Sequence, residues 1–344
     1  MNYDPACETR DVVTKGIRTT SAVLIALFYV LYGHPVVAQE RATPPRKLES
    51  VTLGLSAKHV LNLPIYLAQR HGIFESEGFD LKPITTKTGT AIAALVSGDL
   101  DYITAFNSGL GAALGGAPLM ATYASTDKSP LYLISRPDIK DAKALRGGII
   151  GHGGSRGSHY HATIAMVKYL GLDAEKDVKL ISTIDVTQGL TALFSGNVAA
   201  TTLSPPYDSI AVRKGFTRLV SGPDILPRFV ENGLVVRRIK LRDNPDQVRR
   251  MLRALVRGLH YGIDRPGDAI ALIQKDWNLD KDTAQEAYDA AIPTYNLKGE
   301  GSDEIIATAI KRAQQDAKIA SSNFAPKDYV DWTLIRTVQR ELKR

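Results

Sequence analysis

The stretch PIYLAQRHGIFESEGFDL, residues 64–81, decides how this chain is organised. It predicts a helix over residues 63–70, with Pro64 in the first turn, that ends at a glycine and leads into a strand over 79–84. A second segment, LVSGDLDY at residues 95–102, repeats the change from helix to strand. Alternating strands and helices predict an α/β sheet, and such sheets bind ligands at the ends of their strands.

The alternation continues along the chain in two similar series. The first is expected to contain strands 51–55, 79–84, 102–105 and 119–123 and helices 63–70, 90–96 and 108–114. The second is expected to contain strands 148–151, 178–182, 200–203 and 217–220 and helices 158–170, 186–194 and 207–214. Two such series predict two parallel α/β lobes. After Leu234 the pattern predicts helices only, over 245–264, 266–276, 281–291, 303–319 and 332–343.

The first 38 residues have the pattern of a secretory signal peptide. Arg10, Lys15 and Arg18 precede the apolar run 22–32, and Val36-Val37-Ala38 gives a small-residue cleavage pattern. The run is shorter than the roughly 20 residues that span a bilayer as a helix. We therefore expect cleavage after Ala38, a short leader over residues 39–47 and a periplasmic protein, with an uncleaved N-terminal anchor as the alternative.

The charge and cysteine content narrow the function further. The whole chain carries 43 basic and 36 acidic residues, and residues 39–344 keep 40 and 33 of them, so the net charge of +7 belongs to the mature protein. This charge fits a small anionic ligand or an anionic membrane surface, and the absence of a basic block argues against nucleic acid. The single cysteine, Cys7, precedes the apolar run, which excludes disulfides, cysteine metal sites and a lipidated cysteine at the cleavage point.

Three loops of the first series place polar groups where a strand passes into a helix. Helix starts leave backbone N–H groups unpaired and carry partial positive charge, so they bind anions. The first loop offers Ser56 and His59, with Asn62 as an expected N-cap. The second offers Thr88, which is equally well explained as a cap, and the third offers Asn107 and Ser108.

The second series contains the strongest anion-binding candidate, the loop GHGGSRGS at residues 151–158. Its glycines expose backbone N–H groups, Ser155 adds a hydroxyl and Arg156 adds a fork of donors beside Gly154. The loop has neither the Gly-Lys-Ser/Thr of a Walker motif nor a complete dinucleotide fingerprint. His152, His159 and His161 crowd the same region. A metal site is not expected, because residues at i and i+2 face different sides of a helix and no carboxylate stands beside them.

Two further positions of the second series are candidates. Asp185 precedes a helix, so its carboxylate either caps that helix or pairs with a cationic group of a ligand. The segment Ser204-Pro205-Pro206-Tyr207 forms a stiff turn after a strand and can present the Ser204 hydroxyl or the Tyr207 ring to a ligand. An aromatic ring there would stack on a planar ligand.

Taken in order, several blocks of this sequence resemble the extracytoplasmic solute-binding proteins of ABC importers, in the group that binds nitrate, taurine, alkanesulfonates and thiamin pyrimidines. The blocks are 64–81, 95–101, 153–155, 192–198, 204–206 and 244–245, and the likeness runs from about Val51 to Gln339. The resemblance implies a bilobed periplasmic-binding-protein fold of type II, with two mostly parallel sheets flanked by helices and a ligand between lobes that close by a hinge motion. One lobe would combine residues 48–132 with 234–344, and the other would be the inserted segment 137–230.

The resemblance also implies a function. We expect a monomeric binding protein without a cofactor that captures a small anionic solute, such as a sulfonate or carboxylate, and delivers it to an ABC permease in the inner membrane. A pyrimidine or thiamin-precursor binder is the first alternative, because His59, Tyr66 and Tyr207 leave room for an aromatic body. A ligand-sensing module for a signalling partner is the second. Ala199 stands where the family often has an acidic residue, which weakens the transfer of any one ligand.

Catalysis is not expected, although relatives with this fold include a desulfinase and the fungal enzyme that makes the thiamin pyrimidine. Both are implied to depend on cysteine, and residues 39–344 contain none.

Overall fold

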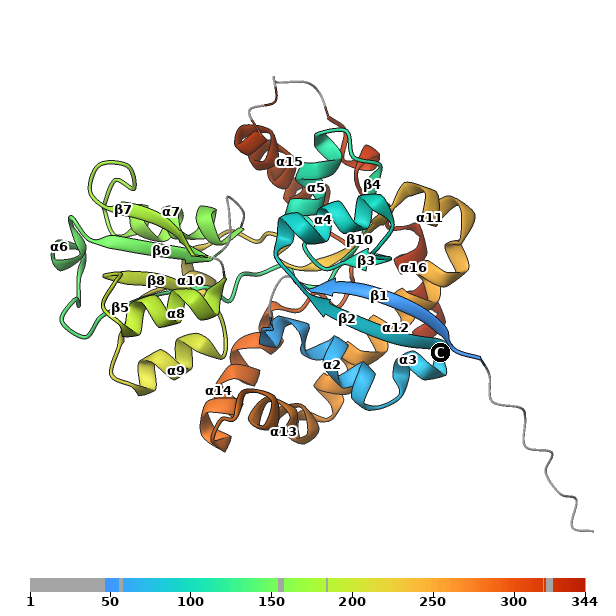
Figure 1. Ribbon diagram of the computed structural model, residues 1–344, viewed down its shortest axis with the longest axis horizontal. Coiled ribbons are helices and arrows are strands. Elements are labelled where there is room, and N and C mark those ends of the chain that lie inside the picture. The colour runs from blue at the N-terminus through green and yellow to red at the C-terminus, as the bar shows by residue number, and fades with distance from the viewer. Residues whose placement is uncertain are drawn as a thin grey trace, which may run out of the picture. The chain divides into compact units, whose positions relative to one another are not determined.

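The computed structural model describes residues 47–55, 58–153, 158–183, 185–317, 319 and 324–343 (Figure 1). The predicted signal peptide over 1–38 and nearly all of the predicted leader lie outside the described residues. Among the helices that are described, none is both long enough and apolar enough to cross a membrane.

The first sheet has five strands in the order β2-β1-β3-β10-β4. They are β1 Glu49–Leu55, β2 Phe79–Thr85, β3 Tyr102–Ile103, β4 Leu119–Ala124 and β10 Gly233–Arg237. β1 pairs in parallel with β2 and β3, whereas β10 pairs antiparallel with both β3 and β4. Four strands therefore run in one direction, and the strand that returns from the far end of the second series runs against them.

The second sheet repeats this plan in the order β7-β6-β8-β5-β9. Its strands are β5 Tyr132–Ser135, β6 Ile149–Gly153, β7 Lys179–Thr183, β8 Ala200–Leu203 and β9 Thr217–Ser221. β6 pairs in parallel with β7 and β8, and β5 is antiparallel to β8 and β9. Both sheets are therefore mixed. The expectation of mostly parallel sheets is confirmed for strand direction, and each sheet also receives one reversed strand, which pairs antiparallel with both of its neighbours.

Helices join the strands of each sheet and form the whole end of the chain. Those of the first sheet are η1 Val60–Asn62, α2 Leu63–Arg70, α3 Ile73–Ser76, α4 Thr88–Ser97 and α5 Phe106–Leu114. Those of the second sheet are α6 Ala142–Leu145, α7 Ser158–Tyr169, α8 Val186–Phe194, α9 Tyr207–Arg213 and α10 Gly222–Ile225. After β10 come α11 Arg238–Asp243, α12 Pro245–Asp264, α13 Pro266–Trp277, α14 Lys281–Ala291, η2 Ile292–Thr294, α15 Asp303–Ala317, η3 Pro326–Asp328 and α16 Thr333–Leu342.

Each sheet has its own apolar core. Leu53, Tyr102 and Phe106 are fully buried in the core of the first sheet, and Ile150 and Met166 are fully buried beside the second. The helices α2, α3 and α12 pack together beside β1 and β2 (Figure 1). Two cores of this kind let each sheet hold its shape by itself, so a ligand that contacts both sheets can act on their relative position.

The chain crosses between the sheets twice, after β4 and again before β10. The two crossings are tied together, because the Phe229 N–H donates to the Asp127 carbonyl at 3.0 Å and the Asn232 N–H donates to Thr126 Oγ1 at 2.9 Å. Arg228 adds an ion pair with Asp127. If the lobes move by a hinge, as the family resemblance implies, these two crossings are the segments that would carry it.

Candidate functional site

The loop that follows β1 contacts the turn that follows β8, so the two sheets meet here. The Tyr207 hydroxyl donates to the Lys58 carbonyl at 3.0 Å, and the Val60 N–H donates to the Pro205 carbonyl at 3.5 Å. Both segments are loops at strand ends, where ligands of α/β sheets bind. We call this region the lobe junction.

Aromatic side chains line the lobe junction beside this contact. The Tyr66 and Trp277 rings meet edge to face with centroids 6.1 Å apart, and Lys58 Nζ lies 5.0 Å from the centroid of the Trp277 ring. Burial raises the pKa of Tyr66 to about 12, so its hydroxyl stays protonated. Trp277 packs against the apolar side chains of both α13–α14 and the second sheet. The junction therefore offers flat apolar surface as well as backbone groups.

A second set of polar side chains gathers close by, and we call His59, His152, Ser158, His159 and Glu231 the histidine cluster. His59 follows β1, His152 belongs to β6, Ser158 and His159 begin α7, and Glu231 lies on the second crossing. The Ser158 hydroxyl donates to Glu231 Oε1 at 2.6 Å. A Cβ added at Gly153 would lie 3.2 Å from His159 Nδ1, so the glycine leaves room for this ring. The cluster thus draws residues from both sheets and the crossing.

The cluster is electrically unusual because its groups are buried. Burial lowers the pKa of His59 to about 4. Burial, with a smaller contribution from positive charge on His59 and His152, lowers the pKa of His159 to about 3. Burial also raises the pKa of Glu231 to about 7, against the opposing effect of the Ser158 hydrogen bond. At neutral pH the histidines are therefore neutral, and Glu231 is poised between its two forms.

Four buried polar atoms of the cluster lack a hydrogen-bond partner within the described part of the chain. They are the Nδ1 atoms of His59, His152 and His159 and Oε2 of Glu231. A buried polar atom left unpaired costs about 1–3 kcal/mol, and most such atoms in proteins have a partner. The four atoms therefore leave hydrogen-bonding capacity that the described residues do not use.

The structure can be compared directly with the site residues expected from the sequence. Ser56, Gly154, Ser155 and Arg156 lie outside the described residues. His59 joins the histidine cluster, and Tyr207 makes the contact with Lys58. Ser204, 2% exposed, opens the same turn, and its carbonyl accepts from the Tyr207 N–H at 2.9 Å.

The remaining expected residues lie at or next to the first turn of a helix. Thr88 is the first residue of α4, and Ser108 lies half-buried in the first turn of α5. Asn107 Nδ2 donates to the Val230 carbonyl at 2.5 Å and so ties α5 to the second crossing. Asp185 caps α8, because Oδ1 accepts from the Gln188 N–H at 2.8 Å. Direct contact of these four residues with a ligand remains a prediction.

One capping expectation was wrong. Asn62 stands at the N-cap of α2, but its side chain makes no capping hydrogen bond. Its Oδ1 instead accepts from Asn232 Nδ2 at 2.8 Å, and both side chains are buried. The bond links the loop after β1 to the second crossing. The cap bond is lost because a buried amide from a distant segment takes its place.

The sequence-based site omitted His152, His159 and Glu231. The two histidines were noticed only as metal ligands, and no group of three or more His, Cys, Asp or Glu among the described residues is arranged to hold a metal ion. Their position around a glycine loop at a strand end was the signal that could have identified them. Glu231 gives no such signal, because only the fold brings the second crossing to α7.

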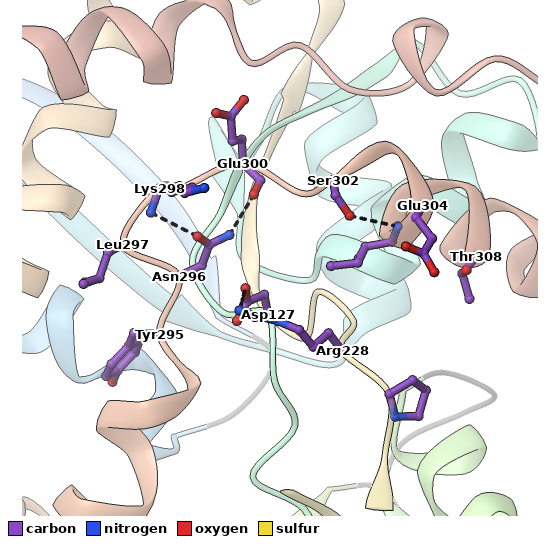
Figure 2. Close-up of a pocket in the computed structure, with 12 residues that line it drawn as sticks. Asp127, Arg228, Tyr295, Asn296, Leu297, Lys298, Glu300, Ser302, Glu304 and Thr308 are labelled. Atoms are coloured by element: carbon purple, nitrogen blue, oxygen red, sulfur yellow. Dashed lines mark hydrogen bonds and ion pairs between the residues drawn. The ribbon is translucent and has the colours of Figure 1, made fainter.

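A separate cavity of about 700 Å³ opens beside the crossings and is drawn in Figure 2. Its polar groups largely satisfy one another. Asn296 holds its own loop, with Nδ2 donating to the Glu300 carbonyl at 2.8 Å and Oδ1 accepting from the Lys298 N–H at 3.0 Å. Arg228 pairs with Asp127, which lies beside Asn296 (Figure 2). The polar side chains of this cavity thus hold its own loops in place, whereas the buried atoms of the histidine cluster have no partner among the described residues.

Comparison with known proteins identifies the class. The family model described as "NMT1/THI5 like" matches residues 61–269, more than half of the chain. The chain therefore belongs to the NMT1/THI5-like family.

Three similar proteins show the range of this fold. A riboflavin-binding protein, RibY of Chloroflexus aurantiacus, is 26% identical over 270 residues, which are 74% of this chain and 76% of RibY. The structure of the periplasmic aliphatic sulphonate binding protein SsuA from Escherichia coli matches with a TM-score of 0.64 and 18% identity, over 82% of this chain and 92% of SsuA. The desulfurization enzyme DszB matches with a TM-score of 0.61 and 15% identity, over 86% and 99%. The last two likenesses establish the periplasmic-binding-protein fold.

Proposed function

We propose that this chain is the solute-binding component of an ABC importer, exported to the periplasm, which holds a small solute at the lobe junction and presents it to a permease in the inner membrane. The observation that carries the proposal is the histidine cluster. Its unpaired atoms come from both sheets and from the crossing between them. A solute bound there would contact both lobes at once.

A solute in this position could drive lobe closure by binding alone, without any chemical reaction. A solute that contacts both lobes binds the closed arrangement more tightly than the open one, so binding shifts the population towards closure. The permease would then recognise the closed form. The fold neighbour DszB is an enzyme, but residues 39–344 of this chain offer no cysteine nucleophile, and we propose binding alone.

For the solute itself, the junction favours a planar ring compound over a simple anion. Tyr66, Trp277 and Tyr207 supply aromatic surface, and the histidines beside them are neutral. The relative RibY is named as a riboflavin binder. The net charge of +7 is the observation that favours the competing solutes, sulfonates and carboxylates.

Calorimetric titration of residues 39–344 tests both solute classes. The panel contains riboflavin, uracil, taurine, an alkanesulfonate and an aromatic carboxylate, and each titration is paired with a thermal-unfolding scan. A true ligand at 100 times its Kd stabilises the protein by about 2.7 kcal/mol. We expect a ring compound to bind without being altered. Turnover of the bound compound would contradict the proposal, and so would the absence of binding across the panel.

A ligand-sensing module is the alternative, and it would use the same site. Reconstitution with a candidate ABC permease and its ATPase separates the two. Solute-dependent ATP hydrolysis supports import. A protein that binds its solute tightly but never stimulates the ATPase would be a sensor.

A further inference from the structure

The unpaired atoms of the histidine cluster also restrict the chemistry of the group that can fill it. We propose that the cluster recognises a cyclic imide edge, in which one N–H lies between two carbonyl oxygens, with Glu231 Oε2 accepting from the N–H and histidine Nδ1 atoms donating to the carbonyls. This inference rests on the proposed function, because it assumes that the solute binds at the lobe junction. It adds the polar edge of the ligand to the flat face that the aromatic residues would contact.

Glu231 is held for this role by its neighbour. Its Oε1 accepts from Ser158 Oγ at 2.6 Å, which fixes the carboxyl plane, while Oε2 is buried and without a partner among the described residues. Ser158 is the first residue of α7, so the acceptor is anchored to a helix of the second sheet. An acceptor fixed in this way favours a ligand that brings an N–H or O–H donor.

The histidines supply the complementary groups. A neutral imidazole has one N–H donor and one acceptor, and the tautomer follows the partner. The Nδ1 atoms of His59 and His159 are both buried and unpaired in the described part of the chain. The rings lie close enough for charge on His59 to affect the pKa of His159. An unpaired acceptor on Glu231 together with unpaired nitrogens from two other segments offers the two kinds of group that an imide edge requires.

The same arrangement is unfavourable for a sulfonate or carboxylate. In the described residues, burial and the Ser158 hydroxyl set the pKa of Glu231, and the only charges that affect His159 are those of other histidines. No described Lys or Arg contributes to either pKa shift. An anion held by these described groups alone would lose its hydration without gaining a counter-charge.

The test combines ligand analogues with variants. Riboflavin and uracil both carry an imide edge, and methylation at N3 removes its only N–H. We expect N3-methylation to weaken calorimetric affinity by about five- to hundredfold, which corresponds to about 1–3 kcal/mol for a buried hydrogen bond that loses one partner. In Glu231→Met, which keeps the length of the side chain but removes the acceptor, methylated and unmethylated compounds should bind alike.

Further variants control for folding and position. Glu231→Gln retains an acceptor oxygen and should recover most of the lost discrimination, so the test survives if Glu231→Met unfolds. His59→Phe should weaken imide binding by a similar factor. The exposed residues Glu75 and His71 give matched controls, Glu75→Met and His71→Phe, which should leave affinity unchanged.

The outcomes separate this inference from the proposed function. If riboflavin or uracil binds but N3-methylation has no effect, or the effect persists in Glu231→Met, the imide inference is overturned and the importer proposal stands. If only sulfonates or carboxylates bind, the imide inference again fails alone. If none of these probes binds, both are rejected. Loss of discrimination confined to Glu231 and His59 variants supports the inference.

Discussion

At the scale of single residues, two arginines surround Glu77, which is 5% exposed at the end of α3. Arg253 Nε donates to both carboxylate oxygens at 2.9 Å, and Arg257 Nη1 donates to Oε1 at 2.8 Å. Burial alone would raise the pKa of Glu77, but these hydrogen bonds outweigh it and lower the pKa. The contact joins the α3–β2 turn to α12.

We therefore expect Glu77→Gln to lower the free energy of unfolding by about 2 kcal/mol at neutral pH, since hydrogen bonds to charged groups contribute about 1.5–3 kcal/mol. Because the folded pKa is depressed, this stabilisation is present above the ordinary value of 4.5 and is lost as the pH falls through the folded value. Thermal scans of both proteins from neutral to acidic pH measure it. A difference that stays constant below pH 4.5 would refute the ion-pair explanation, and the exposed Glu75→Gln should show no loss.

At the scale of elements, the crossing of α12 over α2 depends on one glycine. A Cβ at Gly258 would lie 2.3 Å from the Pro64 carbonyl oxygen and 2.8 Å from the Ala68 Cβ. The helices can approach this closely because Gly258 has no side chain at the point of contact. The close contact at Gly258 therefore holds α2, which connects two strands of the first sheet, against α12.

We expect Gly258→Ala to destabilise the protein by about 1–3 kcal/mol, the usual cost of overpacking, even though alanine favours a helix by about 1 kcal/mol over glycine. Chemical denaturation measures the change. The matched control is Gly267→Ala in the first turn of α13, where an added Cβ meets nothing within 4 Å. That variant should be as stable as the parent or slightly more so. Equal behaviour of the two variants would show that the α2–α12 contact is looser than described.

The elements also show what the sequence could predict. The helix over 63–70, the helix over 245–264 and the strand over 200–203 were placed to the residue, because capping residues and hydrophobic periodicity are local signals. β5 was missed, since a short apolar run next to Pro130 resembles a connection. The reversed strands β5 and β10 could not be assigned, because direction depends on partners distant in sequence.

The same limit applies to the site. His59 and Tyr207 could be selected because each follows a strand, and strand ends are where α/β sheets bind ligands. Glu231 could not be selected from the sequence, because its place in the cluster depends on a hydrogen bond to Ser158, 73 residues away in the chain. Long-range polar pairing leaves no local periodicity to read.

At the scale of the whole molecule, the Tyr207 hydroxyl bond to the Lys58 carbonyl joins loops of different sheets. Under the proposed closing mechanism, this bond would stabilise the arrangement in which the lobes are together. We expect Tyr207→Phe to weaken solute affinity about fivefold, equivalent to about 1 kcal/mol for one hydrogen bond. Calorimetry measures affinity, and small-angle X-ray scattering compares compaction on binding. Unchanged affinity would remove the bond from the closing mechanism. Tyr169→Phe is the control, since Tyr169 is 65% exposed.

Trp277 packs against the apolar side chains of α13–α14 and of the second sheet, and this position has an optical consequence. The chain has two tryptophans, and the other, Trp332, is 8% exposed and stacks on Phe106 within the first core. The Trp332 indole would therefore keep its surroundings in the proposed closure, whereas the Trp277 indole lies where the lobes meet. If the lobes close on a solute as proposed, the change in the protein's own ultraviolet fluorescence would come from Trp277, which would then serve as an internal, label-free gauge of closure.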